Sequence, residues 1–102
     1  MPTITVRVPH SLTPAEALLK AQPALQKTMT DFQGHDLQMQ ADETTASFSF
    51  KSMAFTIKGR VEAGATEVAV TVELPFAAIM FKDQAERALA KNVKRALEPP
   101  PA

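Results

Sequence analysis

The sequence predicts a single α+β domain in which an antiparallel sheet carries two helices on one face. Five short stretches alternate between apolar and polar residues, and two longer stretches carry apolar residues at spacings of three and four. Every alternating stretch is apolar on one side only, whereas strands of a parallel sheet between helices are apolar on both sides. The predicted order is therefore β-α-β-β-β-β-α, in a chain of 102 residues that is long enough to bury its own core.

The first strand and the first helix carry the clearest local signals. Apolar and polar residues alternate over residues 3–8, and Pro9 ends the strand. Thr13, Pro14 and Glu16 then form a helix start, with a hydroxyl N-cap, a proline at the first helical position and a glutamate that can reach back to the cap. The apolar stripe predicted to lie on the sheet follows: Leu18, Ala21, Leu25, Met29 and Phe32.

A proline interrupts this predicted first helix. Pro23 lies between two turns of the apolar stripe. An interior proline removes one backbone hydrogen bond and clashes with the preceding turn, which costs about 3 kcal/mol. The sequence therefore predicts a kink, or two short helices, near Ala21.

Four more strands are predicted after the first helix. They cover residues 36–42, 46–51, 55–62 and 67–74, each with one apolar side. The second and third of these four are predicted to form a hairpin that turns near Met53. Gly34 precedes the first of them, and Gly64 marks the last turn.

A long amphipathic helix is predicted from Pro75 to a point near Leu97. Its first turns hold six consecutive apolar residues, 76–81, which is more than one stripe can bury. Either the first helix or the kink at Pro23 covers the surplus, or these residues form a dimer contact or an apolar ligand surface. Further along, the predicted sheet-facing stripe consists of Ala85, Ala88, Leu89, Asn92, Ala96 and Leu97.

Four basic residues gather on the outer side of the same predicted helix. Cations near a helix C-terminus complement the helix dipole, so a solvated face is the simplest interpretation. Pro99 to Pro101 stop the helix, so the predicted domain spans residues 1–98 and residues 99–102 form a short disordered tail. The four basic residues are Arg87, Lys91, Lys94 and Arg95.

The composition argues against several classes of function. Eleven basic residues balance eleven acidic ones, so the chain lacks the positive field of a nucleic-acid binder. The sequence has no cysteine, which excludes disulfides and thiolate metal sites and fits a reducing compartment. No apolar run is long enough for a membrane span, and the N-terminus lacks the pattern of a signal peptide. We therefore expect a soluble, cytoplasmic protein with no nucleic-acid partner and no transmembrane segment.

Residues that could carry catalysis are few. His10 and His35 both sit beside turn signals with no second histidine at helical spacing, so hydrogen-bonded loop histidines are expected. An enzyme would need one of them to meet a carboxylate in a cleft. No Gly-x-Ser-x-Gly motif occurs, and the three glycines form no phosphate loop. The sequence therefore predicts a protein that is not an enzyme, with no catalytic residues, no cofactor and no metal site.

Several short motifs, in their order along the chain, resemble those of a known family. They are Pro9-His10-Ser11-Leu12, Phe48-Ser49-Phe50, Ile57-Lys58-Gly59-Arg60-Val61, Val70-Thr71-Val72-Glu73-Leu74-Pro75 and Phe81-Lys82. Through them the chain is similar to the polyhydroxyalkanoic acid system family of small bacterial proteins, over roughly residues 3–97. The resemblance implies an accessory or regulatory protein associated with polyester storage granules, with no catalytic residues to transfer.

The resemblance and the surplus apolar residues together suggest how such a protein acts. We expect it to meet the storage granule, or the proteins that coat it, through an apolar surface with a charged rim. Two alternatives stay open: a small domain that binds an acyl chain in a pocket between the helices and the curved sheet, and a homodimer that uses residues 76–81. The candidate surface is Phe76, Ile79, Met80 and Phe81, with Arg87, Lys91, Lys94 and Arg95 as the rim.

Overall fold

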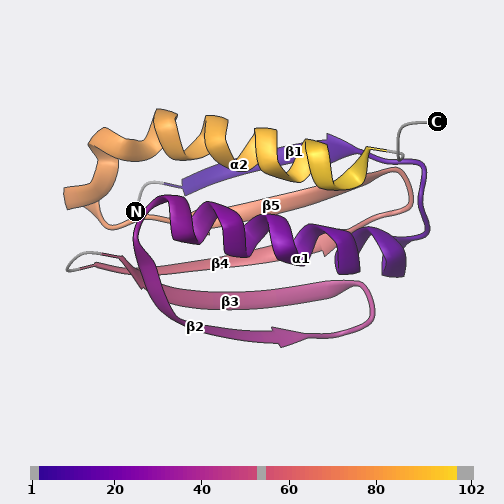
Figure 1. Cartoon of the computed structure of the whole chain (residues 1–102), viewed down its shortest axis with the longest axis horizontal. Coiled ribbons are helices and arrows are strands. Elements are labelled where there is room, and N and C mark those ends of the chain that lie inside the picture. Colours follow the sequence, from indigo (N-terminus) through magenta and orange to yellow (C-terminus); the bar gives the residue numbers. More distant parts are fainter. Residues whose placement is uncertain (1–2, 53–54, 99–102) are drawn as a thin grey trace.

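The computed structural model describes residues 3–52 and 55–98 and confirms the predicted α+β domain (Figure 1). Within these residues, five antiparallel strands form one sheet in the order β1-β5-β4-β3-β2. The elements are β1 (Thr3–Pro9), α1 (Pro14–Asp31), β2 (Gly34–Ala41), β3 (Thr45–Ser52), β4 (Phe55–Ala63), β5 (Glu67–Glu73), the 3-10 helix η1 (Phe76–Phe81) and α2 (Lys82–Leu97). The predicted turn at Met53 and the predicted tail at 99–102 lie outside the described residues.

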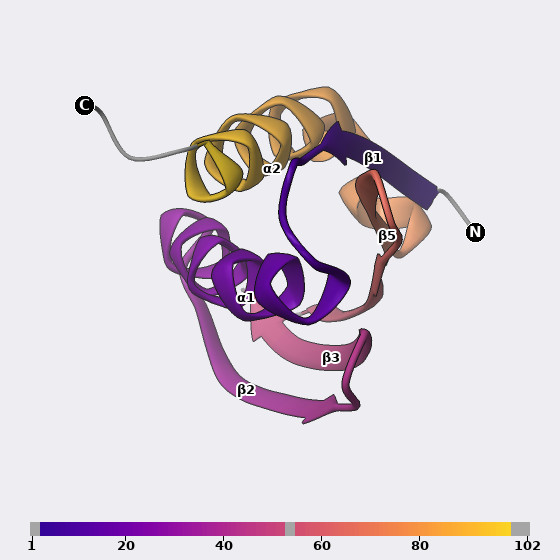
Figure 2. The ribbon, with the colours of Figure 1, turned by 90° about the vertical axis from the view of Figure 1, so that its right-hand side faces the viewer.

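Both helices lie on one face of the sheet, and the sheet curves around α1 (Figure 2). The register of β1 and β5 places their apolar residues opposite one another on the face under the helices, while the alternating polar residues point away. Because each strand has one apolar side, this single face and the two helices enclose the core. The buried cross-strand pairs are Ile4 with Val72, Val6 with Val70, and Val8 with Val68.

The start of α1 follows the prediction. The Thr13 hydroxyl accepts a hydrogen bond from the backbone N–H of Glu16 at 3.2 Å and donates one to Oε1 of Glu16 at 3.0 Å. Both partners of the predicted cap therefore meet, although the Glu16 carboxylate contacts the hydroxyl rather than the cap backbone.

Of the two outcomes predicted near Ala21, two short helices are wrong, because α1 runs as one helix through Pro23. Pro23 lies on the exposed side, where water can replace the backbone hydrogen bond that Leu19 loses. The opposite side of the helix is buried against the sheet, and this burial offsets the local cost of the proline. The buried residues are Ala17, Leu18, Ala21, Ala24 and Leu25.

The edge strand β2 contains an irregularity that the alternation did not predict. The pairing with β3 shifts by one residue between His35 and Gln38, and Asp36 has a φ of 57°. This is a β-bulge, which turns the side chains of His35 and Asp36 both toward solvent. Beyond it Leu37 is half-buried as predicted, whereas Ala41 at the end of the edge strand is exposed.

The C-terminal helix is shorter than predicted, because Phe76–Phe81 forms a 3-10 helix and the α-helix begins at Lys82. Further along α2, Leu89, Asn92 and Leu97 are buried as predicted. Val93 is also fully buried and was missed, although it lies four residues after Leu89 and four before Leu97.

Candidate interaction surface and cavity

The 3-10 geometry of η1 divides its six residues among three edges. A 3-10 helix has three residues per turn, so residues three apart lie one above the other. It begins with a hydrogen bond from the backbone N–H of Ala78 to the carbonyl of Pro75, 2.9 Å long. The three edges hold the pairs Phe76 and Ile79, Ala77 and Met80, and Ala78 and Phe81.

Two of these edges face solvent. Phe76 is 70% exposed, Ile79 is 54% exposed and Met80 is 78% exposed. The interpretation in which the first helix covers the surplus apolar residues is therefore wrong for these three. We call Phe76, Ile79 and Met80 the η1 patch.

The third edge of η1 faces inward. Ala78 is buried, Phe81 is half-buried, and both line a cavity beneath the helices. Phe81 therefore does not join the other three predicted surface residues. The structure separates the predicted apolar surface into an outward patch and an inward wall of the cavity.

The predicted basic residues are exposed on α2 but do not surround the η1 patch. Arg87, Lys91 and Lys94 follow one another at helical spacing, so they form a stripe along one side of the helix. At 1.5 Å per residue, Lys94 lies roughly 20 Å along the chain axis from the end of η1. The four basic residues therefore extend away from the η1 patch along α2, and their role as a charged rim stays a prediction. Within residues 3–52 and 55–98, none of the four basic residues forms an ion pair.

The cavity lies between the sheet and the helices, at the end of the molecule where α1 stops and α2 starts. Its volume is about 260 Å³. Strands β1, β3, β4 and β5, the second half of α1, η1 and the first turns of α2 all contribute to its wall. The apolar part of the wall consists of Ile4, Leu25, Met29, Phe32, Phe48, Phe50, Phe55, Ile57, Val72, Leu74, Ala78, Phe81, Ala85 and Leu89.

Five polar residues complete the described wall of the cavity. The Ser52 hydroxyl donates to the carbonyl of Phe32 at 2.5 Å, so it is engaged within the protein. The other four are Thr28, Asp31, Gln33 and Gln84. Asp31, Gln33 and Gln84 are exposed, which identifies them as the rim of the cavity mouth.

A pair of aromatic rings and a glycine shape the floor of the cavity. The rings of Phe48 and Phe50 are stacked, with centroids 6.3 Å apart. Gly59 lies directly beneath Phe48, since a Cβ at this position would be 2.3 Å from Phe48 Cζ. The missing side chain leaves the space that the end of the Phe48 ring occupies. Sequence alternation identified these positions as core but carried no signal for the space above them.

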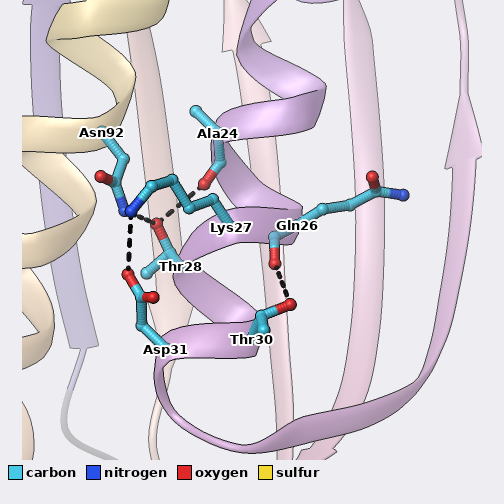
Figure 3. Close-up of polar contacts among 7 residues, drawn as sticks. All are labelled: Ala24, Gln26, Lys27, Thr28, Thr30, Asp31 and Asn92. Carbon is cyan, nitrogen blue, oxygen red and sulfur yellow. Dashed lines mark hydrogen bonds and ion pairs between the residues drawn. The ribbon is translucent and has the colours of Figure 1, made fainter.

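A hydrogen bond between the buried Asn92 and the half-buried Thr28 joins the two helices at the cavity wall (Figure 3). The Asn92 amide on α2 donates to Oγ1 of Thr28 at 2.8 Å, and the Thr28 hydroxyl donates to the carbonyl of Ala24 at 2.8 Å. One turn away, Lys27 and Asp31 form an ion pair at 3.5 Å. The hydrogen bond between Asn92 and Thr28 joins the last turns of α1 to α2 at the cavity wall, whereas the other two contacts lie within α1.

Both histidines take local structural positions. Nδ1 of His10 accepts from the backbone N–H of Leu12 at 3.0 Å, so Nε2 carries the proton and donates to the carbonyl of Gly64 at 2.8 Å. His10 thereby ties the end of β1 to the turn before β5. His35 contacts Asp36 at 3.0 Å on the exposed bulge. Neither histidine lines the cavity.

Ion pairs form on the polar face of the sheet, away from the cavity. On the polar face of the sheet, Arg7 pairs with Glu67 at 2.9 Å and Arg60 with Glu62 at 3.1 Å. Among the described residues, no group of three or more His, Asp or Glu side chains is placed to hold a metal ion. None of the helices in residues 3–52 and 55–98 has the length and apolar character needed to cross a membrane.

The fold and the site together define a small α+β protein with an apolar cavity and an exposed apolar turn beside it. The chain belongs to the polyhydroxyalkanoic acid system family, since the family model described as "Putative polyhydroxyalkanoic acid system protein" matches residues 4–97. It is therefore a protein related to the polyhydroxyalkanoate system. This confirms the resemblance seen in the sequence motifs.

Comparison with individual proteins adds little. No curated protein matches the chain. The crystal structure of Ara h 8.0201 is similar over 94% of this chain and 97% of that chain, with 12% identity and a TM-score of 0.49. The crystal structure of TTHA0849 from Thermus thermophilus is similar over 94% of this chain and 92% of that chain, with 12% identity and a TM-score of 0.35. At these TM-scores and identities, neither structure bears on function.

Proposed function

We propose that this protein is a non-enzymatic accessory protein of the polyhydroxyalkanoate system that docks on the apolar surface of the storage granule in the cytoplasm. The observation that carries the proposal is the η1 patch, in which three large apolar side chains of one short helix face solvent. Storage polyesters are aliphatic, so they offer such side chains a surface on which to be buried. Family membership supports the choice of this partner.

The size of the η1 patch implies weak, reversible docking. Fully burying a Phe, Ile or Met side chain contributes roughly 1.5–3 kcal/mol. Association costs about 4–15 kcal/mol in lost translational and rotational freedom. Burial of three side chains therefore offsets the cost of association in part, or exceeds it by a small margin, so the net binding free energy is small. A granule presents a continuous surface, and such docking suits a protein that exchanges between the surface and solution.

Replacing two residues of the η1 patch is expected to weaken granule binding strongly with little change in stability. Ile79→Ser combined with Met80→Ser should lower cosedimentation with isolated granules at least about tenfold, because the buried apolar area is lost. Both side chains are already exposed, so the melting temperature should stay within about 2 °C of the original value. Leu19→Ser on α1 is the matched control, since Leu19 is 67% exposed and lies outside the η1 patch.

A salt series with bare and coated granules identifies the partner. Docking on the polymer should occur on bare granules and persist at high salt, because apolar burial is not screened. Binding that requires the coat and falls with salt would instead point to coat proteins and to the basic stripe of α2. Equal cosedimentation of the double serine variant and the original protein would refute the role of the η1 patch.

A second candidate function is the binding of a small apolar ligand, and the cavity favours it. The cavity of about 260 Å³ has a mainly apolar wall, as ligand sites do. Such a protein should copurify with a small molecule or gain thermal stability when the ligand is added.

A third possibility is that a second copy of the chain covers the η1 patch and forms a homodimer. In that case the mass would rise with concentration for the original protein but not for the double serine variant.

A further inference from the structure

We infer that the cavity accepts an uncharged hydroxyalkanoate ester, with its aliphatic chain inside and its hydroxyl and ester groups at the mouth, and that it rejects the corresponding carboxylate. The inference rests on the second candidate function, ligand binding, and specifies the chemical class of the ligand. It follows from the size of the cavity, the charges on its wall and the hydrogen-bonding groups at its mouth.

The volume of the cavity suits a short chain. A dry apolar cavity of roughly 150 Å³ holds a benzene molecule. By the same scale, the volume of about 260 Å³ found here holds on the order of ten carbon atoms. Long acyl chains would not fit within it, whereas a single medium-length hydroxyalkanoate unit would.

The charges on the wall exclude an anion. A carboxylate can enter an apolar site only if a cation or several hydrogen-bond donors replace its water. None of the described residues that line the cavity is basic, and the one charged residue among them is Asp31. Lys27, which pairs with Asp31, does not line the cavity, and its side chain is 64% exposed. A ligand carboxylate would therefore meet a like charge at the mouth and no compensating cation inside.

The mouth offers neutral hydrogen-bonding groups. Among the described residues, the side-chain amides of Gln33 and Gln84 form no hydrogen bond within the protein. Each amide can donate to an ester carbonyl and accept from a hydroxyl group. Gln33 has a φ of 58°, a conformation that favours glycine, yet the position carries a side chain that reaches the mouth. These groups match the hydroxyl and ester of the proposed ligand.

The inference is tested by comparing two ligands that have the same aliphatic chain but differ in charge. Methyl 3-hydroxyoctanoate and 3-hydroxyoctanoate share the same hydroxylated chain and differ in the ester and the carboxylate. Titration calorimetry near neutral pH, where the free acid is ionised, is expected to give a Kd at least about tenfold lower for the ester. Asp31→Asn should lower the ratio of the Kd of the acid to the Kd of the ester severalfold, because the carboxylate that repels the acid is removed. Asp42→Asn, a carboxylate that does not line the cavity, should leave the ratio unchanged.

A cavity-filling substitution shows where the ester binds. Ala85→Leu places additional carbon atoms into the cavity from α2 and should abolish ester binding, while the melting temperature stays the same or rises because the substitution fills empty space. Ala88→Leu on the same helix is the control, because Ala88 is half-buried but does not line the cavity. Ester binding that survives Ala85→Leu would overturn the assignment to the cavity.

The outcomes separate the inference from the functions on which it builds. If the acid and the ester bind within about twofold of each other, the ligand class is wrong and the ligand-binding function stands. If the ester does not bind saturably, the inference fails, whereas the second candidate function is decided separately by the search for a copurified or stabilising ligand. Neither result changes the granule test, because the double serine variant alters the outward edges of η1 and leaves the cavity wall intact.

Discussion

Gly59→Ala is expected to lower the free energy of unfolding by about 1–3 kcal/mol, the usual range for overpacking a core. Gly59 lies on the core face of β4, between Phe48 on β3 and Val72 on β5. An added Cβ would be 2.3 Å from Phe48 Cζ and 2.8 Å from the backbone carbonyl oxygen of Thr71. The carbonyl is fixed in the sheet, and the Phe48 ring is buried and stacked on Phe50. Neither neighbour can withdraw without disturbing the packing around it.

The effect of Gly59→Ala is measured by urea and thermal unfolding. In a domain of this size, 1 kcal/mol shifts the melting temperature by roughly 4–8 °C, so the change is easily resolved. Gly64→Ala is the control, since its Cβ would lie 3.2 Å from a single atom, the carbonyl oxygen of Glu67 in an exposed turn. Adding Phe48→Leu to Gly59→Ala should restore part of the lost free energy of unfolding, because the smaller leucine side chain no longer overlaps with the added Cβ. Equal stability of the Gly59 and Gly64 variants would contradict this account of the floor of the cavity.

The strands were predictable because alternation reports directly on burial of one face. In β1 and β5 every isoleucine and valine is buried, and the register pairs these residues with one another. The helix start at Thr13 was predictable for a similar reason, since an N-cap depends on residues within one turn. Features that depend on neighbours in sequence, or on a simple period, are therefore accessible from the sequence alone.

The departures from prediction arise from contacts between distant parts of the chain. Pro23 does not break α1 because its helix is held by burial on the opposite side, which local propensity does not report. The 3-10 form of η1 places Ala78 and Phe81 one above the other on the cavity wall, whereas an α-helix would offset two residues three apart by about 60° around the axis. The bulge in β2 likewise depends on its pairing with β3.

The candidate site was only partly predictable. The exposure of Phe76, Ile79 and Met80 was only one of two alternatives, because six consecutive apolar residues exceed one stripe but do not show whether another element covers the surplus. The cavity was raised only as an alternative, because its volume depends on the curvature of the sheet and the spacing of the helices rather than on any one segment. The basic stripe extends away from the η1 patch because α2 continues from the end of η1. The positions of the four basic residues in the sequence were enough to predict this separation.

Thr28→Val is expected to destabilise the protein by about 1–3 kcal/mol, more than the loss of one hydrogen bond between exposed groups. The Asn92 amide is buried and its Nδ2 donates to Oγ1 of Thr28. Valine has nearly the shape of threonine but no acceptor, so the amide would be left without a partner. No buried side-chain nitrogen or oxygen atom in residues 3–52 and 55–98 lacks a partner in the original protein. The variant therefore introduces a defect that the described chain does not otherwise contain.

The reverse substitution should behave differently, and this asymmetry tests the explanation. Asn92→Leu removes the donor, but the Thr28 hydroxyl still donates to the carbonyl of Ala24 and is not orphaned. Asn92→Leu should therefore lower the free energy of unfolding by less than Thr28→Val does. When Thr28→Val is added to Asn92→Leu, it should lower the free energy of unfolding by less than about 0.5 kcal/mol. A double-mutant cycle from urea unfolding would then give a coupling energy of about 1–2 kcal/mol. Additive effects of the two substitutions would show that the contact between α1 and α2 depends on apolar packing around Val93 and Leu89 rather than on this hydrogen bond.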